Sequence, residues 1–487
     1  KNYILHPFSL KRSERILYLV MLNMILKFAL LFVRIFPDDV DFYRFTGSLF
    51  LRGIIPYSDF IVPGSHIVDI ELFFNTLHPN GPLNYIFYGF WMFAFGDSVF
   101  AIKVPWLISE ILITILIYMI AEQLIDSDKA FLASMIYTLM PMSYFLGIFV
   151  GCDELITSAF TIAAVYFFIK QKNGLSSIFL ALGTSYKLFP VFGLLPVFYY
   201  FISRKEIKQF INYLLYFVAT YLIMAFPFIV LDFGAFTYWN FSQANRTITI
   251  PYFYHHRDEA FFSPIFTLFM IPVSPYTFYQ IGLMSIIILP RRYKLVIKKE
   301  TEYSLLDYLK DFSILILMLP LLSLSNNYRY FFWMLPFLII YFMSRWNLGV
   351  PAKEFEPILV IQSIILIVFT TIILIISYTI ESCLVLFSVH CYNTYIFTFL
   401  LVYLFYGLPT VFTLINKRFN KNYLIFTIAS IIAGTSSLML YEYWESIQYL
   451  PEQPIYEVIS IITLLIATTI FLRLIFEDNP LTSKKDK

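Results

Sequence analysis

The chain has 487 residues, of which 59% are hydrophobic, 20% aromatic and only 14% charged. Soluble domains carry about 25% charged residues, so this composition excludes a soluble globular protein and predicts an all-α, polytopic membrane protein. The net charge of +2 is spread over many short basic clusters. It therefore predicts no basic surface for nucleic acid.

Apolar runs long enough to cross a bilayer predict fourteen membrane-spanning helices. We expect them at 16–35, 99–123, 130–149, 154–170, 175–187, 189–203, 209–232, 273–290, 308–324, 330–344, 357–380, 394–416, 423–440 and 454–476. The short fifth and sixth spans are expected to form a broken pair around Lys187 and Pro190, because Pro interrupts a helix. The spans group into three parts: 1–232, 233–345 and a separate C-terminal module at 346–487.

The basic residues predict which side of the membrane each loop faces. With both termini in the cytoplasm, 25 of the 34 Lys and Arg residues fall on inner segments, as is typical of cytoplasmic loops. We therefore expect a multi-pass protein of the cell membrane, or of the endoplasmic reticulum in a eukaryote. Two long segments, 36–98 and 233–272, then face the extracytoplasmic side. The stretch 81–96 is apolar but short, and we expect it to be an interfacial helix.

The first outer segment begins with Asp38, Asp39 and Asp41, directly after the first span. Ionisable residues at a membrane boundary are costly and usually functional. A helix that begins near Val40 offers a second interpretation, because Asp is a favoured N-cap residue, and this interpretation suits Asp38 best. Tyr43 follows Asp39 by four residues, so both side chains lie on one face of such a helix, whereas Asp41 faces away from Asp39.

Asp153 and Lys187 are also expected at the outer ends of spans. Asp153 lies in GCDE (151–154) between the third and fourth spans. In one interpretation Asp39 and Asp153 together hold a divalent cation such as Mg²⁺ or Mn²⁺, and in the other Asp153 caps the fourth span. Lys187 ends the fifth span, where it either pairs with a lipid phosphate or extends toward the headgroups.

Further cations on the predicted outer side are candidates for phosphate binding. Arg329 lies in a tight turn between the ninth and tenth spans. Arg suits bidentate phosphate recognition, although a turn in an aromatic belt also accommodates it. The second outer loop adds weaker candidates, which are Arg246, Arg257, His255 and His256.

The order of these motifs resembles that of the GT-C glycosyltransferases. These are polytopic membrane enzymes, mannosyltransferases among them, that move a sugar from a polyprenyl-phosphate carrier to an acceptor. The motifs that carry the likeness are DDVDFY (38–43), GIIPYSD (53–59), NGPLNYIFYGFWMFAFG (80–96), GCDELI (151–156), SYKLFP (185–190) and NNYRYFFWMLPF (326–337). The resemblance covers about residues 16–345.

The resemblance implies a GT-C fold with large extracytoplasmic loops that carry juxtamembrane helices. It implies inverting transfer of mannose or another hexose to a lipid-, glycan- or protein-linked acceptor on the extracytoplasmic face. Asp39 matches the acidic position of the first outer loop and is expected to be the general base. Asp38, Asp41, Tyr43 and Asp153 are expected to support it or to position the acceptor. The residues expected at the carrier phosphate are Lys187, Arg329, Arg246, Arg257, His255 and His256.

Two other functions stay open at this point. A secondary transporter places charges near the bilayer midplane and usually carries internal repeats. Here the acidic residues cluster at one interface, and the sequence has no evident repeat of fixed period. A non-catalytic lipid-binding subunit would keep the fold without turnover, so only an activity measurement separates it from an enzyme.

Overall fold

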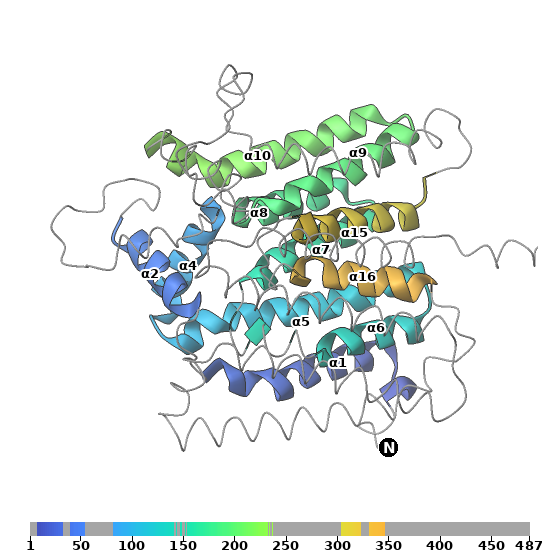
Figure 1. Cartoon of the computed structure of the whole chain (residues 1–487), viewed down its shortest axis with the longest axis horizontal. Coiled ribbons are helices and arrows are strands. Elements are labelled where there is room, and N and C mark those ends of the chain that lie inside the picture. The colour runs from blue at the N-terminus through green and yellow to red at the C-terminus, as the bar shows by residue number, and fades with distance from the viewer. Residues whose placement is uncertain are drawn as a thin grey trace, which may run out of the picture. The chain divides into compact units, whose positions relative to one another are not determined.

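A computed structural model of the chain describes residues 7–32, 39–53, 81–140, 143, 147, 148, 151, 153–231, 233, 236, 303–322 and 331–345. Apart from Met140, all of them belong to one compact unit. Every regular element in this part of the chain is a helix (Figure 1). The predicted all-α class is confirmed for these residues.

The helices follow the predicted spans closely. They are η1 (Pro7–Ser9), α1 (Arg12–Lys27), η2 (Phe28–Phe32), α2 (Asp39–Leu51), α4 (Pro82–Phe95), α5 (Val99–Leu124), α6 (Ser127–Leu139), α7 (Glu154–Ile169), α8 (Asn173–Tyr186), η4 (Phe189–Gly193), α9 (Leu194–Ser203), α10 (Ile207–Leu231), α15 (Leu305–Leu322) and α16 (Phe331–Arg345). Nine predicted spans fall on these helices. The other five, 273–290, 357–380, 394–416, 423–440 and 454–476, lie outside the described residues. The division into parts at 232 and 345 stays a prediction.

Two details of the span prediction can be compared with the structure. The broken pair around Lys187 is confirmed, because α8 ends at Tyr186 and the short helix η4 with Pro190 separates it from α9. The third span was predicted to run over 130–149. The helix α6 ends at Leu139, two residues before Pro141, and a Pro disfavours α-helical backbone at the residue before it. The described residues 143, 147 and 148 are again helical, in a π-helix, so the end at 149 stays a prediction.

Consecutive helices run in alternating directions, so their junctions gather at two ends of the unit (Figure 1). One end holds the start of α1 and the α5–α6, α7–α8 and α9–α10 turns, all of which were predicted to lie inside. Asn173 and Gln209 join two of these turns through a 3.2 Å hydrogen bond. The opposite end holds α2, α4 and the junction between α8 and η4.

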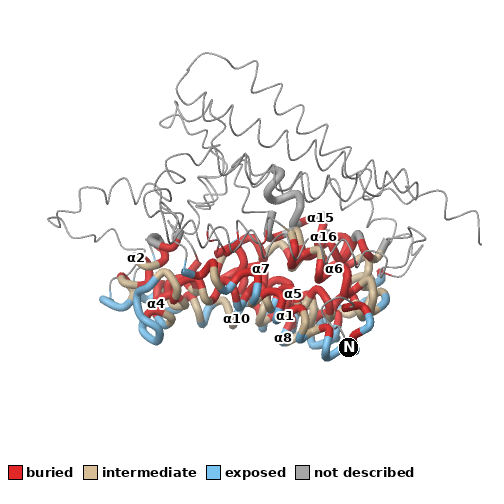
Figure 2. Tube along the Cα trace, turned by 90° about the horizontal axis from the view of Figure 1, so that it is seen from below, coloured by how far each residue is buried: buried red, intermediate tan, exposed pale blue. Residues whose placement is uncertain are grey.

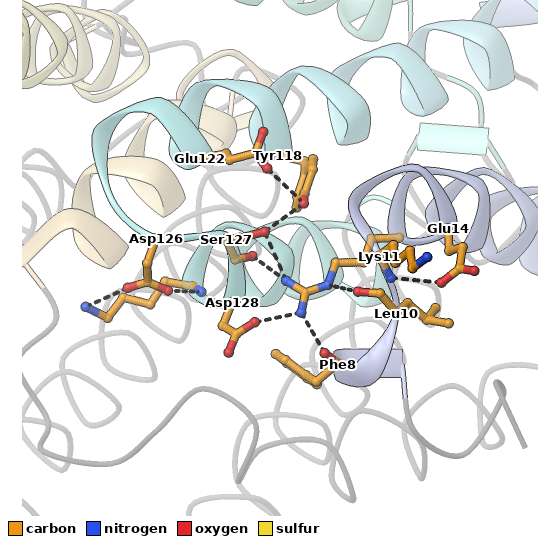
Figure 3. Close-up of polar contacts among 11 residues, drawn as sticks. Phe8, Leu10, Lys11, Glu14, Tyr118, Glu122, Asp126, Ser127 and Asp128 are labelled. Atoms are coloured by element: carbon orange, nitrogen blue, oxygen red, sulfur yellow. Dashed lines mark hydrogen bonds and ion pairs between the residues drawn. The ribbon is translucent and has the colours of Figure 1, made fainter. Parts of the chain in front are cut away.

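Arg15 connects several segments at the first of these ends, and Figure 3 labels its partners Phe8, Leu10, Ser127 and Asp128. Its guanidinium group donates to the carbonyl oxygens of Phe8 (2.6 Å) and Leu10 (3.0 Å). It also donates to the carbonyl oxygen of Ser127 (2.9 Å) and to Asp128 Oδ1 (2.7 Å) at the start of α6. Since Arg is always charged and has five N–H donors, this one buried side chain ties the N-terminal segment to the α5–α6 turn.

Three helical stretches in the described residues are long and apolar enough to cross a membrane, namely Arg12–Phe32, Val99–Leu124 and Ile207–Leu231. Figure 2 shows buried stretches along α5, α6 and α7. The helix α10 instead exposes large apolar side chains, among them Ile223 (66%) and Val230 (64%). Apolar surface of this extent on so long a helix is typical of contact with lipid. The chain is a multi-pass membrane protein.

The helices α2 and α4 pack closely against each other at the second end (Figure 1). Gly47 and Gly89 permit this approach, because a Cβ atom on Gly47 would overlap Met92 and one on Gly89 would overlap the Phe50 ring. Arg44 on α2 also forms an ion pair with Asp97, which follows α4. The position of α2, which begins at Asp39, is therefore fixed by α4.

Candidate active site

Three chain segments meet at the end of the unit that holds α2 and α4. The first is the start of α4, where Gly81 precedes Pro82, a residue suited to the first turn of a helix. The second is the start of α7, directly after Asp153. The third is Lys187, which takes an extended conformation after α8 (φ −143°, ψ 138°). They contribute the polar side chains of the candidate site.

Lys187 connects two of these segments through two short ion pairs. Its Nζ atom lies 2.6 Å from Asp153 Oδ1 and 2.6 Å from Glu154 Oε1. The Lys187 side chain is 17% exposed, whereas those of Asp153 and Glu154 are 0% and 4% exposed. A buried carboxylate is costly unless it is paired, and Lys187 pairs with both of the acidic residues at the start of α7.

Asp153 lies at the N-cap position of α7, but its side chain does not cap the helix. Its Oδ2 atom instead accepts a 3.2 Å hydrogen bond from Asn84 Nδ2, and Asn84 is fully buried on α4. The capping interpretation of Asp153 is therefore wrong. The same carboxylate binds α4 through one oxygen and the end of α8 through the other.

Backbone contacts bring the first and third segments together. Gly81 donates a 2.9 Å hydrogen bond from its backbone N–H to the carbonyl oxygen of Tyr186. A Cβ atom at Gly81 would overlap the carbonyl oxygen of Ser185. Only glycine fits this approach, which places Asn84, one turn into α4, beside the start of α7.

An aromatic cluster links this polar group to α2. The Trp106 indole on α5 donates a 2.8 Å hydrogen bond to the Tyr88 hydroxyl on α4. Tyr43 on α2 stacks on Tyr88, with ring centroids 4.5 Å apart and planes 20° apart. Burial raises the pKa of the Tyr88 phenol well above its ordinary value, and the charge of Asp153 raises it further. Tyr88 therefore stays protonated and neutral at physiological pH.

The structure brings together three of the predicted site residues. Asp153 and Lys187 are in direct contact, and Tyr43 reaches the same region through Tyr88. Lys187 does not extend to the headgroups as one interpretation had it, because it points to the two carboxylates. The backbones of Asp39 and Asp41 belong to α2, but their side chains lie outside the described residues. The remaining candidates also lie outside them: Asp38, Arg246, His255, His256, Arg257 and Arg329.

The described residues do not fit a divalent cation at Asp153. Both of its carboxylate oxygens accept hydrogen bonds from donors, Lys187 and Asn84. Within this part of the chain no group of three His, Cys, Asp or Glu side chains has a metal-binding arrangement. The proposed pairing of Asp153 with Asp39 at a cation is not tested, since the Asp39 carboxylate is outside the described residues.

Sequence reasoning gave no role to Asn84, Tyr88, Trp106 or Glu154. A signal for two of them was present, because Asn84 and Tyr88 are four residues apart in an otherwise apolar stretch and so share a helix face. Glu154 directly follows Asp153, but adjacent residues on a helix point in different directions. Only the tertiary position of Lys187 brings both carboxylates to one partner.

Residues 78–230 match the family of dolichyl-phosphate-mannose-protein mannosyltransferases. This region contains Asn84, Asp153, Glu154 and Lys187 as well as the helices α4 to α10. No curated protein matches the sequence.

Two solved structures show a weak likeness to the chain. One is ArnT from Cupriavidus metallidurans bound to undecaprenyl phosphate, with 11% identity and a TM-score of 0.43 over 96% of this chain and 77% of that chain. The other is the oligosaccharyltransferase of Archaeoglobus fulgidus in complex with Zn and sulfate, with 14% identity and a TM-score of 0.34 over 79% and 52% of the two chains. Both TM-scores are too low for a function to be inferred from these structures.

The chain is thus a helical membrane protein that is similar over residues 78–230 to the dolichyl-phosphate-mannose-protein mannosyltransferases.

Proposed function

We propose that this chain is an inverting glycosyltransferase that moves a hexose, such as mannose, from a polyprenyl-phosphate carrier to a lipid-, glycan- or protein-linked hydroxyl group. We place the reaction on the extracytoplasmic face, at the end of the unit that holds α2 and α4. The observation that carries the proposal is the contact of Lys187 with Asp153 and Glu154, within the region that matches the family.

In this reaction the acceptor oxygen forms a bond to the anomeric carbon as the bond from that carbon to the phosphate oxygen breaks. The bonding electron pair leaves with the polyprenyl phosphate, and the acceptor proton passes to a carboxylate base. A single displacement of this kind inverts the anomeric centre. The leaving phosphate gains negative charge, so a fixed cation beside it lowers the barrier.

Lys187 has the properties that the phosphate site requires. An ammonium group has three N–H donors, and Asp153 and Glu154 accept two of them. Among the described residues no acceptor takes the third, and the side chain is 17% exposed. We propose that the carboxylates fix the ammonium group while a carrier phosphate oxygen takes the third donor. Arg329, Arg246, Arg257, His255 and His256 are further candidates for the same phosphate.

Asp39, the first residue of α2, is the proposed base because its carboxylate can accept a proton and its position matches the acidic residue of the first outer loop in the GT-C resemblance. Tyr43, one turn further on, stacks on Tyr88 and lies edge-on to Trp106, with ring centroids 6.1 Å apart. These contacts support a position of α2 beside the Lys187 cluster. Asp38, Asp41 and Tyr43 are proposed to position the acceptor or the base.

The test uses the purified full chain in liposomes with a synthetic polyprenyl-phosphate-mannose donor and a panel of hydroxyl acceptors. We expect release of polyprenyl phosphate together with an inverted glycosidic product. A secondary transporter would move substrate without cleaving the donor, and a non-catalytic subunit would bind the donor without consuming it. Either outcome would contradict the proposal, provided that the chain also fails to consume donors that carry hexoses other than mannose.

A further inference from the structure

Lys27, Glu110 and Ser143 form a second polar cluster, which the proposed reaction does not use. All three are fully buried. Lys27 Nζ lies 3.1 Å from Glu110 Oε2 and donates to Ser143 Oγ at 2.6 Å. Ser143 Oγ in turn donates to Glu110 Oε2 at 3.0 Å. Charges inside a membrane-spanning region are costly and usually have a function. We therefore expect this cluster to have a function.

The cluster and the candidate site share one face of α5. Glu110 follows Trp106 by four residues, which places both side chains on the same side of the helix. Trp106 contacts the site through its hydrogen bond to Tyr88. Trp106 and Glu110, which contact the two polar groups, are therefore one helical turn apart on α5, with Cβ atoms about 5–6 Å from each other.

The connection between α6 and α7 touches both groups. Ser143 binds Glu110 near the start of this connection. Gly151, near its end, has φ of +100°, and a Cβ atom there would lie 2.6 Å from the Trp106 ring. Asp153 follows Gly151 by two residues and begins the pair of carboxylates that bind Lys187. The connection is thus held on α5 at two points before it enters the site.

We infer that Lys27 and Glu110 are positioning residues, which fix the α6–α7 connection through Ser143 and so orient Asp153 and Glu154 toward Lys187. The kinetic consequence of this role rests on the proposed function, but the structural consequence does not. Loss of the Ser143 hydroxyl should loosen the connection and the Lys187 cluster, and leave the helices intact.

The experiment compares Ser143→Ala with Thr114→Val in the full chain in liposomes. Thr114 is a matched control, because it is fully buried on the same face of α5, one turn beyond Glu110. Its hydroxyl accepts from Asn23 at 3.2 Å, lies 3.3 Å from that of Thr138 and donates to the backbone carbonyl oxygen of Glu110 at 2.9 Å, away from the Glu110 carboxylate. These contacts involve neither Ser143 nor the α6–α7 connection.

Two readouts are measured for both variants. The first is hydrogen–deuterium exchange of peptides from 140–156 without substrate; we expect faster exchange in Ser143→Ala and unchanged exchange in Thr114→Val. The second is donor turnover; we expect Ser143→Ala to raise KM roughly threefold to tenfold, the effect of one hydrogen bond, with kcat nearly unchanged.

The two readouts separate the inference from the proposed function. If the wild-type chain consumes no donor, the proposed function fails, and the exchange measurement alone decides the positioning role. Unchanged exchange in Ser143→Ala, or an equal increase in Thr114→Val, would overturn the inference. An unchanged KM in an active Ser143→Ala enzyme would also overturn it.

Discussion

Lys187 Nζ lies 2.6 Å from Asp153 Oδ1, although the two residues are 34 positions apart in the chain. The contact joins the end of α8 to the start of α7, and Asn84 adds the start of α4 through the second oxygen of the same carboxylate. Three of the motifs that define the family likeness thus meet at one buried carboxylate. Lys187 forms ion pairs with both Asp153 and Glu154, so we expect the stability of this arrangement to depend on Lys187.

Replacing Lys187 with Met should weaken donor binding. The loss of a hydrogen bond to a charged group, about 1.5–3 kcal/mol, corresponds to roughly a 10- to 150-fold lower affinity. The measurement is binding of the polyprenyl-phosphate donor to purified protein. Lys172→Met, at the opposite end of α8 and exposed, is the matched control and should bind as the wild type does.

The Lys187 substitution also removes the ammonium group that pairs with two buried carboxylates, and breaking a buried ion pair is expected to cost about 3–5 kcal/mol of stability. A second variant, Lys187→Met with Glu154→Gln, removes one of these charges and should recover part of that loss in thermal unfolding. Wild-type donor affinity in both Lys187 variants would exclude the phosphate role.

Gly81→Ala should destabilise the protein because its Cβ atom would overlap the carbonyl oxygen of Ser185. Overpacking of this kind typically costs about 1–3 kcal/mol. Gly174→Ala is the control, since a Cβ atom there would meet the Tyr216 ring at an ordinary 3.7 Å. Thermal unfolding in detergent measures both. An equal effect of the two substitutions would show that the α4–α8 approach does not depend on glycine.

Tyr88→Phe should keep the stacking on Tyr43 but remove the acceptor for the Trp106 indole N–H. An unsatisfied buried donor costs about 1–3 kcal/mol. A double-mutant cycle with Trp106→Phe measures the interaction directly, and we expect a coupling energy of about 0.5–3 kcal/mol. Purely additive effects would mean that the hydrogen bond does not contribute to stability.

The alternation of the helices predicts that residues at the two ends of the unit lie on opposite sides of the membrane. Single cysteines at Phe95, which ends α4, and at Lys172, which precedes α8, would be introduced into a chain without its three native cysteines. A membrane-impermeant thiol reagent should label Phe95→Cys from outside and Lys172→Cys only after permeabilisation. Labelling of both from one side would contradict the predicted topology.

Much of the helical framework could be predicted from the sequence, because long apolar runs bounded by charged turns define span ends. The predicted spans 99–123 and 154–170 differ from α5 and α7 by one residue. In the third span the α-helix ends at Leu139 and the described residues 143, 147 and 148 are π-helical, a change of helix type that an apolar run alone does not predict. The break around Lys187 was predictable because Pro190 is a local signal.

The candidate site was predictable only as separate residues. Asp153 and Lys187 are visible in the sequence as ionisable groups at the ends of apolar runs. Their mutual contact, and the role of Asn84, are not, because these partners are 34 and 69 residues away from Asp153. Such contacts depend on how α4, α7 and α8 pack, and helix packing is not encoded in the periodicity of any one helix.

The most direct test of the account is the rate of sugar transfer by Asp39→Asn beside Asp41→Asn. Both substitutions keep the size of the side chain, and both positions lie in the first turn of α2. Loss of general-base catalysis typically lowers the rate by about 10²–10⁴-fold, so we predict this loss for Asp39→Asn with donor binding retained. We predict a much smaller change for Asp41→Asn. Full activity of Asp39→Asn would contradict the assignment of Asp39 as the base, and full activity of both variants together with Asp38→Asn would contradict the proposed mechanism.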